Sequence, residues 1–147
     1  MSEEINKSGT FSDVEREAMR ARAKELKAEA RAAKNREEGE KDVLNAIEQM
    51  TEPDKSMGSK IHELVKKTAP ALLPKTWYGM PAYANENGQV VCFFKAGGKY
   101  ESRYATLGFN DPANIDDGNM WATSFALIKL TAAEENEIIE LVKKAIS

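Results

Sequence analysis

Residues 76–95 read TWYGMPAYANENGQVVCFFK, and from Thr76 onward the apolar residues lose their helical spacing. Aromatic and β-branched residues favour strands, whereas Gly79 and Pro81 weaken one. Proline has no amide hydrogen to donate, so Pro81 belongs at an edge or a bulge. We therefore predict an edge strand over 76–84 that is kinked at Gly79, where a bulge can reset the alternation. The turn signal ENG at 86–88 then leads into a second strand over 89–96.

The second strand is apolar on both faces. In VVCFF, residues 90–94, Val90, Cys92 and Phe94 face one way, and Val91 and Phe93 face the other. An antiparallel strand with one face in water should instead alternate apolar and polar residues. One face can be covered by the helices of the domain. The other face needs a second cover, which could be the N-terminal helix, a partner subunit or a ligand.

The remaining elements complete an α+β domain. Two further strands are predicted at 103–109 and 122–129, with a turn signal GG at 97–98. Predicted helices cover 12–37 and 41–50, a third starts at TEPD (51–54) and ends at Pro70, and the last starts at a T-x-x-E capping box formed by Thr131 and Glu134. We expect a single antiparallel sheet of about four strands with helices packed on one face. This domain, 41–147, follows residues 1–38, a disordered tip and a long charged helix.

The predicted helix 12–37 is strongly basic. Between Arg16 and Arg36 eight Lys or Arg stand against three Glu, a surplus of +5 that leaves −8 for the rest of the chain. A narrow apolar seam of Met19, Ala23, Leu26, Ala30 and Ala33 recurs at 4-3-4-3 spacing. The seam could pack on the domain or on a second copy of itself, or it could remain without a packing partner. The basic residues beside it could bind nucleic acid or an acidic partner, but without interleaved aromatics a solvated surface is favoured over nucleic acid.

Composition narrows the class of protein. The net charge is −3, no stretch is long enough to span a membrane, and the first residues, MSEEINKSG, lack the apolar core of a signal peptide. A single cysteine rules out an internal disulfide and fits a reducing compartment. We therefore expect a soluble cytoplasmic protein without membrane contact.

Sequence motifs of catalysis are missing. One cysteine and one histidine cannot build a zinc cluster, AGGK at 96–99 lacks the Walker spacing, and there is no Gly-x-Ser-x-Gly elbow. Cys92 and His62 would form a nucleophilic pair only if the fold brought them together. The loop NDPANIDDGNMW, 110–121, holds Asp111, Asp116 and Asp117, which could gather a hard cation, although plain turn chemistry is favoured. We expect no catalytic residues, and the sequence identifies no cofactor and no metal ligands.

Aromatic residues recur on every predicted strand and are the best candidates for a site. Such residues most often fill a core. Pockets, however, are apolar with a few polar groups. We therefore predict a non-catalytic binding module whose aromatic-lined sheet face holds a small molecule or a protein segment. The candidate ligand-binding residues are Trp77, Tyr78, Met80, Tyr83, Phe94, Tyr104 and Trp121.

Four motifs, WYGMPAY, VVCFFK, YATLGF and IDDGNMWATSFALIKL, together resemble the YdhG-like domain family over about residues 41–147. The resemblance implies a small α/β domain with an antiparallel sheet and flanking helices. Some members are described as frataxin-like intracellular iron chaperones, so the alternative function is weak iron binding by surface carboxylates. Candidates are Asp111, Asp116 and Asp117, or Glu134, Glu135 and Glu137. Ala122 and the stretch LIKL depart from the family pattern, and no iron-ligand set carries over.

Overall fold

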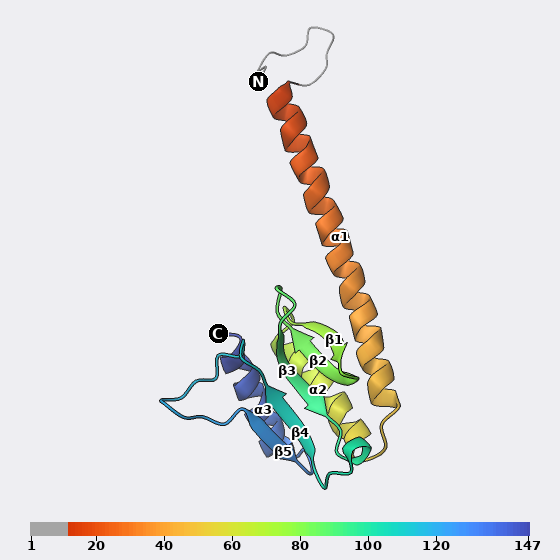
Figure 1. Ribbon diagram of the computed structural model, residues 1–147, viewed down its shortest axis with the longest axis vertical. Helices are drawn as coiled ribbons and strands as arrows, with labels where there is room; N and C mark the ends of the chain where they lie inside the picture. Colours follow the sequence, from red (N-terminus) through yellow and green to blue (C-terminus); the bar gives the residue numbers. More distant parts are fainter. Residues whose placement is uncertain (1–11) are drawn as a thin grey trace. The chain divides into compact units, whose positions relative to one another are not determined.

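The computed structural model describes residues 12–147, apart from the side chains of Ala28, Glu29 and Ala32 (Figure 1). The predicted disordered tip, residues 1–10, lies outside the described residues. The chain forms two compact units, of which one ends at Glu37 and the other comprises Glu38–Ser147. The secondary structure confirms an α+β protein with one antiparallel sheet.

Helix α1 (Asp13–Glu48) is one continuous helix, so the predicted break between residues 37 and 41 is wrong. Its start is as predicted, because Ser12 Oγ accepts the Glu15 amide at 3.2 Å. In the first unit the seam residues are exposed, and Met19 keeps 52% of its surface accessible. Self-association through the seam stays a prediction.

Gly39 continues the helix instead of ending it, and it does so because of close packing. A Cβ built on Gly39 would lie 2.0 Å from the carbonyl oxygen of Pro74. Only a glycine lets the helix backbone approach the first strand this closely. The residue that looks like a helix stop in the sequence is therefore a contact point within the unit Glu38–Ser147.

Five strands form the sheet in the order β1-β2-β3-β4-β5, each antiparallel to its neighbour. Figure 1 shows helices α2 (Asp54–Thr68) and α3 (Ala132–Ala145) together on one face. The core between them and the sheet includes Ile61, Phe94, Leu107 and Val142. The strands are β1 (Leu73–Trp77), β2 (Met80–Ala84), β3 (Val90–Lys95), β4 (Ala105–Phe109) and β5 (Ser124–Leu127), and a short 3-10 helix, η1 (Gly98–Tyr100), follows β3.

The predicted strand 76–84 is in fact a hairpin, which raises the number of strands from four to five. Trp77 pairs with Met80, so Tyr78 and Gly79 form a two-residue turn. Both have positive φ, 51° and 78°, as a type I′ turn requires. Gly79 is thus a turn residue and carries no bulge.

The bulge lies in β3 instead. Tyr83 pairs with Cys92 and Ala84 with Val90, so Val91 is the extra residue and belongs to the core. On the opposite face of the sheet, Phe93 packs where a side chain of Gly108 would be, and Trp77 contacts the Phe93 ring at 5.2 Å between centroids. The second face of β3 is therefore partly covered by side chains of the sheet itself.

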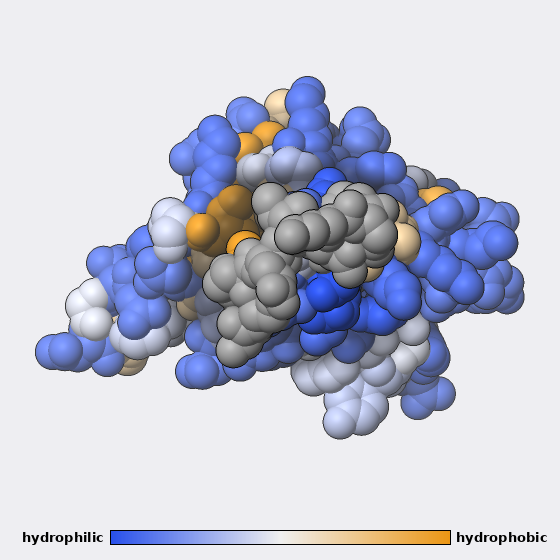
Figure 2. All heavy atoms as spheres, turned by 90° about the horizontal axis from the view of Figure 1, so that it is seen from above, coloured by the Kyte–Doolittle hydropathy of each residue, from blue (hydrophilic) through white to orange (hydrophobic). Residues whose placement is uncertain are grey.

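Hydrophilic residues dominate the face of the molecule in Figure 2, and hydrophobic residues appear there only in small separate places.

Helix α3 begins at the predicted capping box: Glu134 Oε1 accepts the amide and the hydroxyl of Thr131, both at 2.7 Å. No helix within residues 12–147 has the length and apolar character needed to cross a membrane.

Candidate functional site

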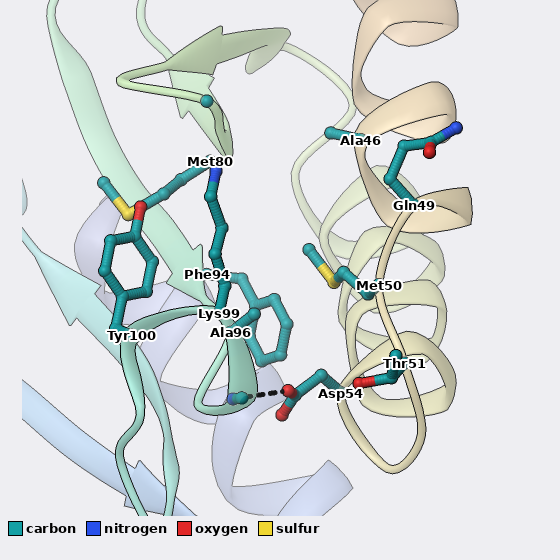
Figure 3. Close-up of a pocket in the computed structure, with 12 residues that line it drawn as sticks. Ala46, Gln49, Met50, Thr51, Asp54, Met80, Phe94, Ala96, Lys99 and Tyr100 are labelled. Atoms are coloured by element: carbon teal, nitrogen blue, oxygen red, sulfur yellow. Dashed lines mark hydrogen bonds between the residues drawn. The ribbon is translucent and has the colours of Figure 1, made fainter.

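A pocket of about 500 Å³ opens between the last turn of α1, the start of α2, the β1–β2 hairpin and η1 (Figure 3). Its apolar wall comes from Met50, Phe94 and Ala96, and Figure 3 shows the Phe94 ring between β3 and α2. The other lining residues are Ala46, Gln49, Thr51, Asp54, Gly79, Met80, Gly98, Lys99 and Tyr100. The pocket therefore combines an apolar interior with a few polar groups, which is the usual character of a small-molecule site.

Asp54 fixes the geometry of the pocket. It is the first residue of α2, and it is buried. Its Oδ2 accepts the amide of Gly98 at 2.9 Å, the bond drawn in Figure 3. This hydrogen bond ties η1 to the start of α2, so Lys99 and Tyr100 are held at the pocket.

Positive charge gathers on the η1 side. Figure 3 shows the Lys99 side chain extending toward the β1–β2 hairpin, and a Cβ built on Gly79 would lie 3.2 Å from Lys99 Nζ. The ammonium groups of Lys95 and Lys99 lie 4.6 and 5.6 Å from the centre of the Tyr100 ring. These cation–π contacts hold the two lysines close to the aromatic ring. An anionic or hydrogen-bond-accepting group in the pocket would therefore interact with the ammonium group of Lys99.

Of the seven candidate residues, the structure places only Met80 and Phe94 at this pocket. Tyr83 is buried in the core, and Tyr78, at the tip of the β1–β2 hairpin, is 81% exposed. Trp77 contacts Tyr78 and Phe93 and does not line the pocket.

The last two candidates lie in other hollows. Tyr104 lines one of about 200 Å³, and Trp121 lines one of about 620 Å³. The structure therefore does not collect the seven residues on a single sheet face, and their role in binding stays a prediction.

None of the five polar residues that line the pocket was among the seven candidates: Gln49, Thr51, Asp54, Lys99 and Tyr100. Asp54 resembles an ordinary first-turn acid of a helix, and its partner Gly98 is distant in sequence. The available signal was GGKY, 97–100, where a lysine and a tyrosine directly follow a Gly-Gly turn after the most apolar strand. Turn residues placed by a rigid sheet often carry function.

A second polar cluster lies in the interior around His62. Its Nδ1 lies 2.9 Å from the Tyr83 hydroxyl, and its Nε2 lies 3.2 Å from Glu40 Oε1. Lys66 Nζ donates to the same Glu40 oxygen at 2.6 Å. In the tautomer that donates Nε2–H to Glu40, Nδ1 accepts the Tyr83 hydroxyl proton. Burial raises the pKa of Tyr83, which keeps that proton in place.

Cys92 and His62 do not form a nucleophilic pair. Both ring nitrogens of His62 are hydrogen-bonded to Tyr83 and Glu40. Cys92 is fully buried, and burial raises the pKa of its thiol to about 12. The thiolate needed for attack is therefore scarce at neutral pH.

Glu40 should make the stability of the unit Glu38–Ser147 depend on pH. The hydrogen bond from Lys66 is the largest cause that lowers the pKa of Glu40 below 4.5, followed by that from His62. A carboxyl whose pKa is lower in the folded state stabilises it above the unfolded pKa, and this contribution disappears as the pH falls through the folded pKa. We expect Glu40→Gln, which keeps an oxygen for His62, to cost about 1 kcal/mol at pH 7.

Urea unfolding of both proteins at a series of pH values checks this, and the difference should vanish well below pH 4.5. The control is Glu63→Gln, because Glu63 is exposed and 3.7 Å from Lys60, and it should change little at any pH. A pH-independent loss in Glu40→Gln would contradict the expectation.

The acidic residues named for iron do not converge. Asp111, Asp116 and Asp117 are exposed along the segment between β4 and β5, and Glu134 is engaged by Thr131. Among residues 12–147 no group of three or more His, Cys, Asp or Glu side chains is arranged to hold a metal ion.

Comparison with known proteins found no matching family model, no matching curated protein and no matching solved structure. The resemblance to YdhG-like domains, and the iron binding that it implies, therefore stay predictions.

Proposed function

We propose that the protein is a binding module that holds a small organic molecule in the pocket between α1, α2 and η1. The observation that carries this proposal is the pocket itself: about 500 Å³, with an apolar interior. Ligand sites commonly have volumes of about 300–1,000 Å³ and a few polar groups that fix orientation.

The polar groups define the chemistry of the ligand. One oxygen of Asp54 is already taken by the Gly98 amide, so this carboxylate serves the fold. Lys99 carries the positive charge of the lining and lies near the hairpin turn. Met50 and Met80, both partly exposed, offer apolar surface to a ligand. The matching ligand has an apolar body and one carboxylate or other acceptor group that meets Lys99.

An NMR screen of small aryl carboxylates against the ¹⁵N-labelled full chain tests the proposal. We expect shifts at the amides of Gly79, Ala96 and Lys99. In Lys99→Gln the best carboxylate should bind about tenfold more weakly, which corresponds to about 1.4 kcal/mol. The matched control is Lys67→Gln, since Lys67 is exposed on α2 outside the pocket lining.

The neutral amide of the same compound should be insensitive to Lys99→Gln, because the lost interaction is with charge. Millimolar fragments that leave these amides unmoved, or a carboxylate whose affinity ignores Lys99→Gln, would contradict the proposed function.

A further inference from the structure

Strand β5 leaves one side of its backbone without a partner among the described residues. It is the last strand of the sheet, and it pairs only with β4 (Figure 1). The Phe109 amide donates to the Thr123 carbonyl at 2.8 Å, so positions 123, 125 and 127 face β4 with their hydrogen-bonding groups. The amides and carbonyls of Ser124, Ala126 and Ile128 therefore point to the open edge. All three residues are exposed.

The opposite edge of the sheet, at β1, is protected against pairing with a further strand, whereas the edge at β5 is not. Strand β1 contains Pro74 and Lys75, residues that typically block pairing at an edge. The backbone of α1 at Gly39 also approaches Pro74 closely. Strand β5, with sequence SFAL, contains no proline and no charge. The chain thus blocks one edge and leaves the other able to pair.

A groove runs beside the open edge, between β5 and α3. It has a volume of about 360 Å³ and is lined by Phe125 and Leu127 of β5 and by Ile138 and Leu141 of α3. It meets the hollow of about 620 Å³ at Trp121, since Phe125 and Leu141 line both. Next to Trp121, Met120 is 89% exposed. Apolar side chains on alternate positions of an added strand would enter this groove.

One end of the groove is acidic. Glu134 and Glu137 line the hollow near the start of α3, whereas the hollow near Trp121 is lined by one acidic residue, Asp117, and one basic residue, Lys144. A strand antiparallel to β5 would begin near Leu127 and Glu137 and finish near Ser124 and Lys144. The complementary charge on such a strand is therefore a basic residue toward its N-terminus.

We propose that the edge of β5, together with the β5–α3 groove, binds an extended peptide segment of a partner protein by adding it to the sheet as an antiparallel strand. The backbone of Ser124, Ala126 and Ile128 supplies hydrogen bonds, and the groove takes alternate apolar side chains. This site is separate from the pocket at η1, because the two share no lining residues.

A single strand fits this edge better than a second copy of the chain. Leu127 is buried in its own core and Phe125 packs against it, so a copy pairing through β5 brings no free β5 side chain for the groove. Figure 1 also shows the segment between β4 and β5 reaching outward beyond β5. A folded copy has to avoid this segment, whereas one extended strand can lie between it and α3.

The test begins with a phage library of random heptapeptides selected on the full chain. Enriched peptides should carry apolar residues at alternate positions and a basic residue in their first half. A synthetic copy of the best one is then measured by fluorescence polarisation and amide hydrogen exchange. On binding, the amides of Ser124, Ala126 and Ile128 should become protected, whereas those of Phe125 and Leu127 are protected with or without peptide.

Two variants and one matched control test the proposal further. Ala126→Pro removes an outward amide without touching the β4 ladder, and it should weaken the peptide about tenfold or more because hydrogen bonds at the edge are lost. The matched control Ala126→Thr keeps the amide and should bind within about threefold. Glu137→Lys should reverse the preference for a basic residue in the first half of the peptide.

Three outcomes would overturn the proposal: no peptide is enriched, the exchange of the β5 amides does not change on binding, or Ala126→Pro folds and binds as well as the wild type. Sedimentation supplies a fourth. A concentration-dependent dimer that Ala126→Pro abolishes would assign the edge to a second copy. The exchange experiment uses the wild-type chain, so it stands even if Ala126→Pro does not fold.

Discussion

Gly39→Ala should destabilise the unit Glu38–Ser147 by about 2 kcal/mol or more, in the range for forced contacts in a packed interior. Helix propensity alone predicts the opposite sign, since alanine is better than glycine within a helix by up to about 1 kcal/mol. Sterics decide against it. The new Cβ would lie 2.0 Å from the Pro74 carbonyl oxygen and 3.1 Å from its carbon. Both are backbone atoms, so α1 or β1 has to move.

Urea unfolding followed by circular dichroism measures the effect, and two other substitutions calibrate it. Asn45→Ala, at an exposed position of the same helix, should stabilise by a few tenths of a kcal/mol. Gly58→Ala should lie between the two, because its Cβ meets the Phe94 ring at 3.1 Å and a ring can shift slightly. If Gly39→Ala were as stable as the wild type, the close approach of α1 to β1 would be wrong.

Two helix starts predicted from a local signal are confirmed. The capping box of Thr131 and Glu134 lies within one turn, and so does the cap of Ser12 on Glu15; both form as expected. The prediction failed at Gly39 because its cause is a contact with Pro74, far along the chain. Local propensity describes what a residue prefers alone, and tertiary packing overrides it.

Tyr78 explains the miscounted strands. Aromatic residues favour strands, so a Tyr-Gly pair between two apolar stretches looked like the middle of one strand. A type I′ turn usually carries Asn-Gly or Asp-Gly, and Tyr78 adopts a positive φ of 51° that bulky residues rarely take. Gly79 indicates a turn, but the strand propensity of Tyr78 favours a continuous strand.

The candidate site was predicted only in part for a related reason. Side-chain type identified Met80 and Phe94, which do line the pocket, because both are apolar residues next to a turn. It could not distinguish them from Tyr83, whose hydroxyl satisfies His62 in the core. Nor could it find Asp54, whose position depends on a hydrogen bond to Gly98 between separate elements. A pocket is formed by elements that are distant in sequence, and a single sequence does not reveal which of them pack against each other.

The neighbouring residues Phe93 and Phe94 should differ sharply in what they contribute to stability. Phe94 has none of its surface exposed, packs against Gly58 of α2 and belongs to the core. Phe93 is partly exposed on the opposite face, between Trp77 and Gly108. We expect Phe94→Ala to cost about 3–5 kcal/mol, the usual loss when a buried phenylalanine leaves a cavity.

Phe93→Ala should cost clearly less, about 1–2 kcal/mol, because the removed ring is already partly in water and its neighbours can relax. Urea unfolding of both variants gives the comparison, and tryptophan fluorescence adds a local readout, since Trp77 contacts Phe93. Only Phe93→Ala should change the emission of the folded state through Trp77. Equal losses of unfolding free energy for the two substitutions would mean that both faces of β3 are equally buried, as the sequence VVCFF alone suggests. Unequal losses would show that α2 and the bulge at Val91 make one face the core, while the other is covered only by Trp77 and the sheet.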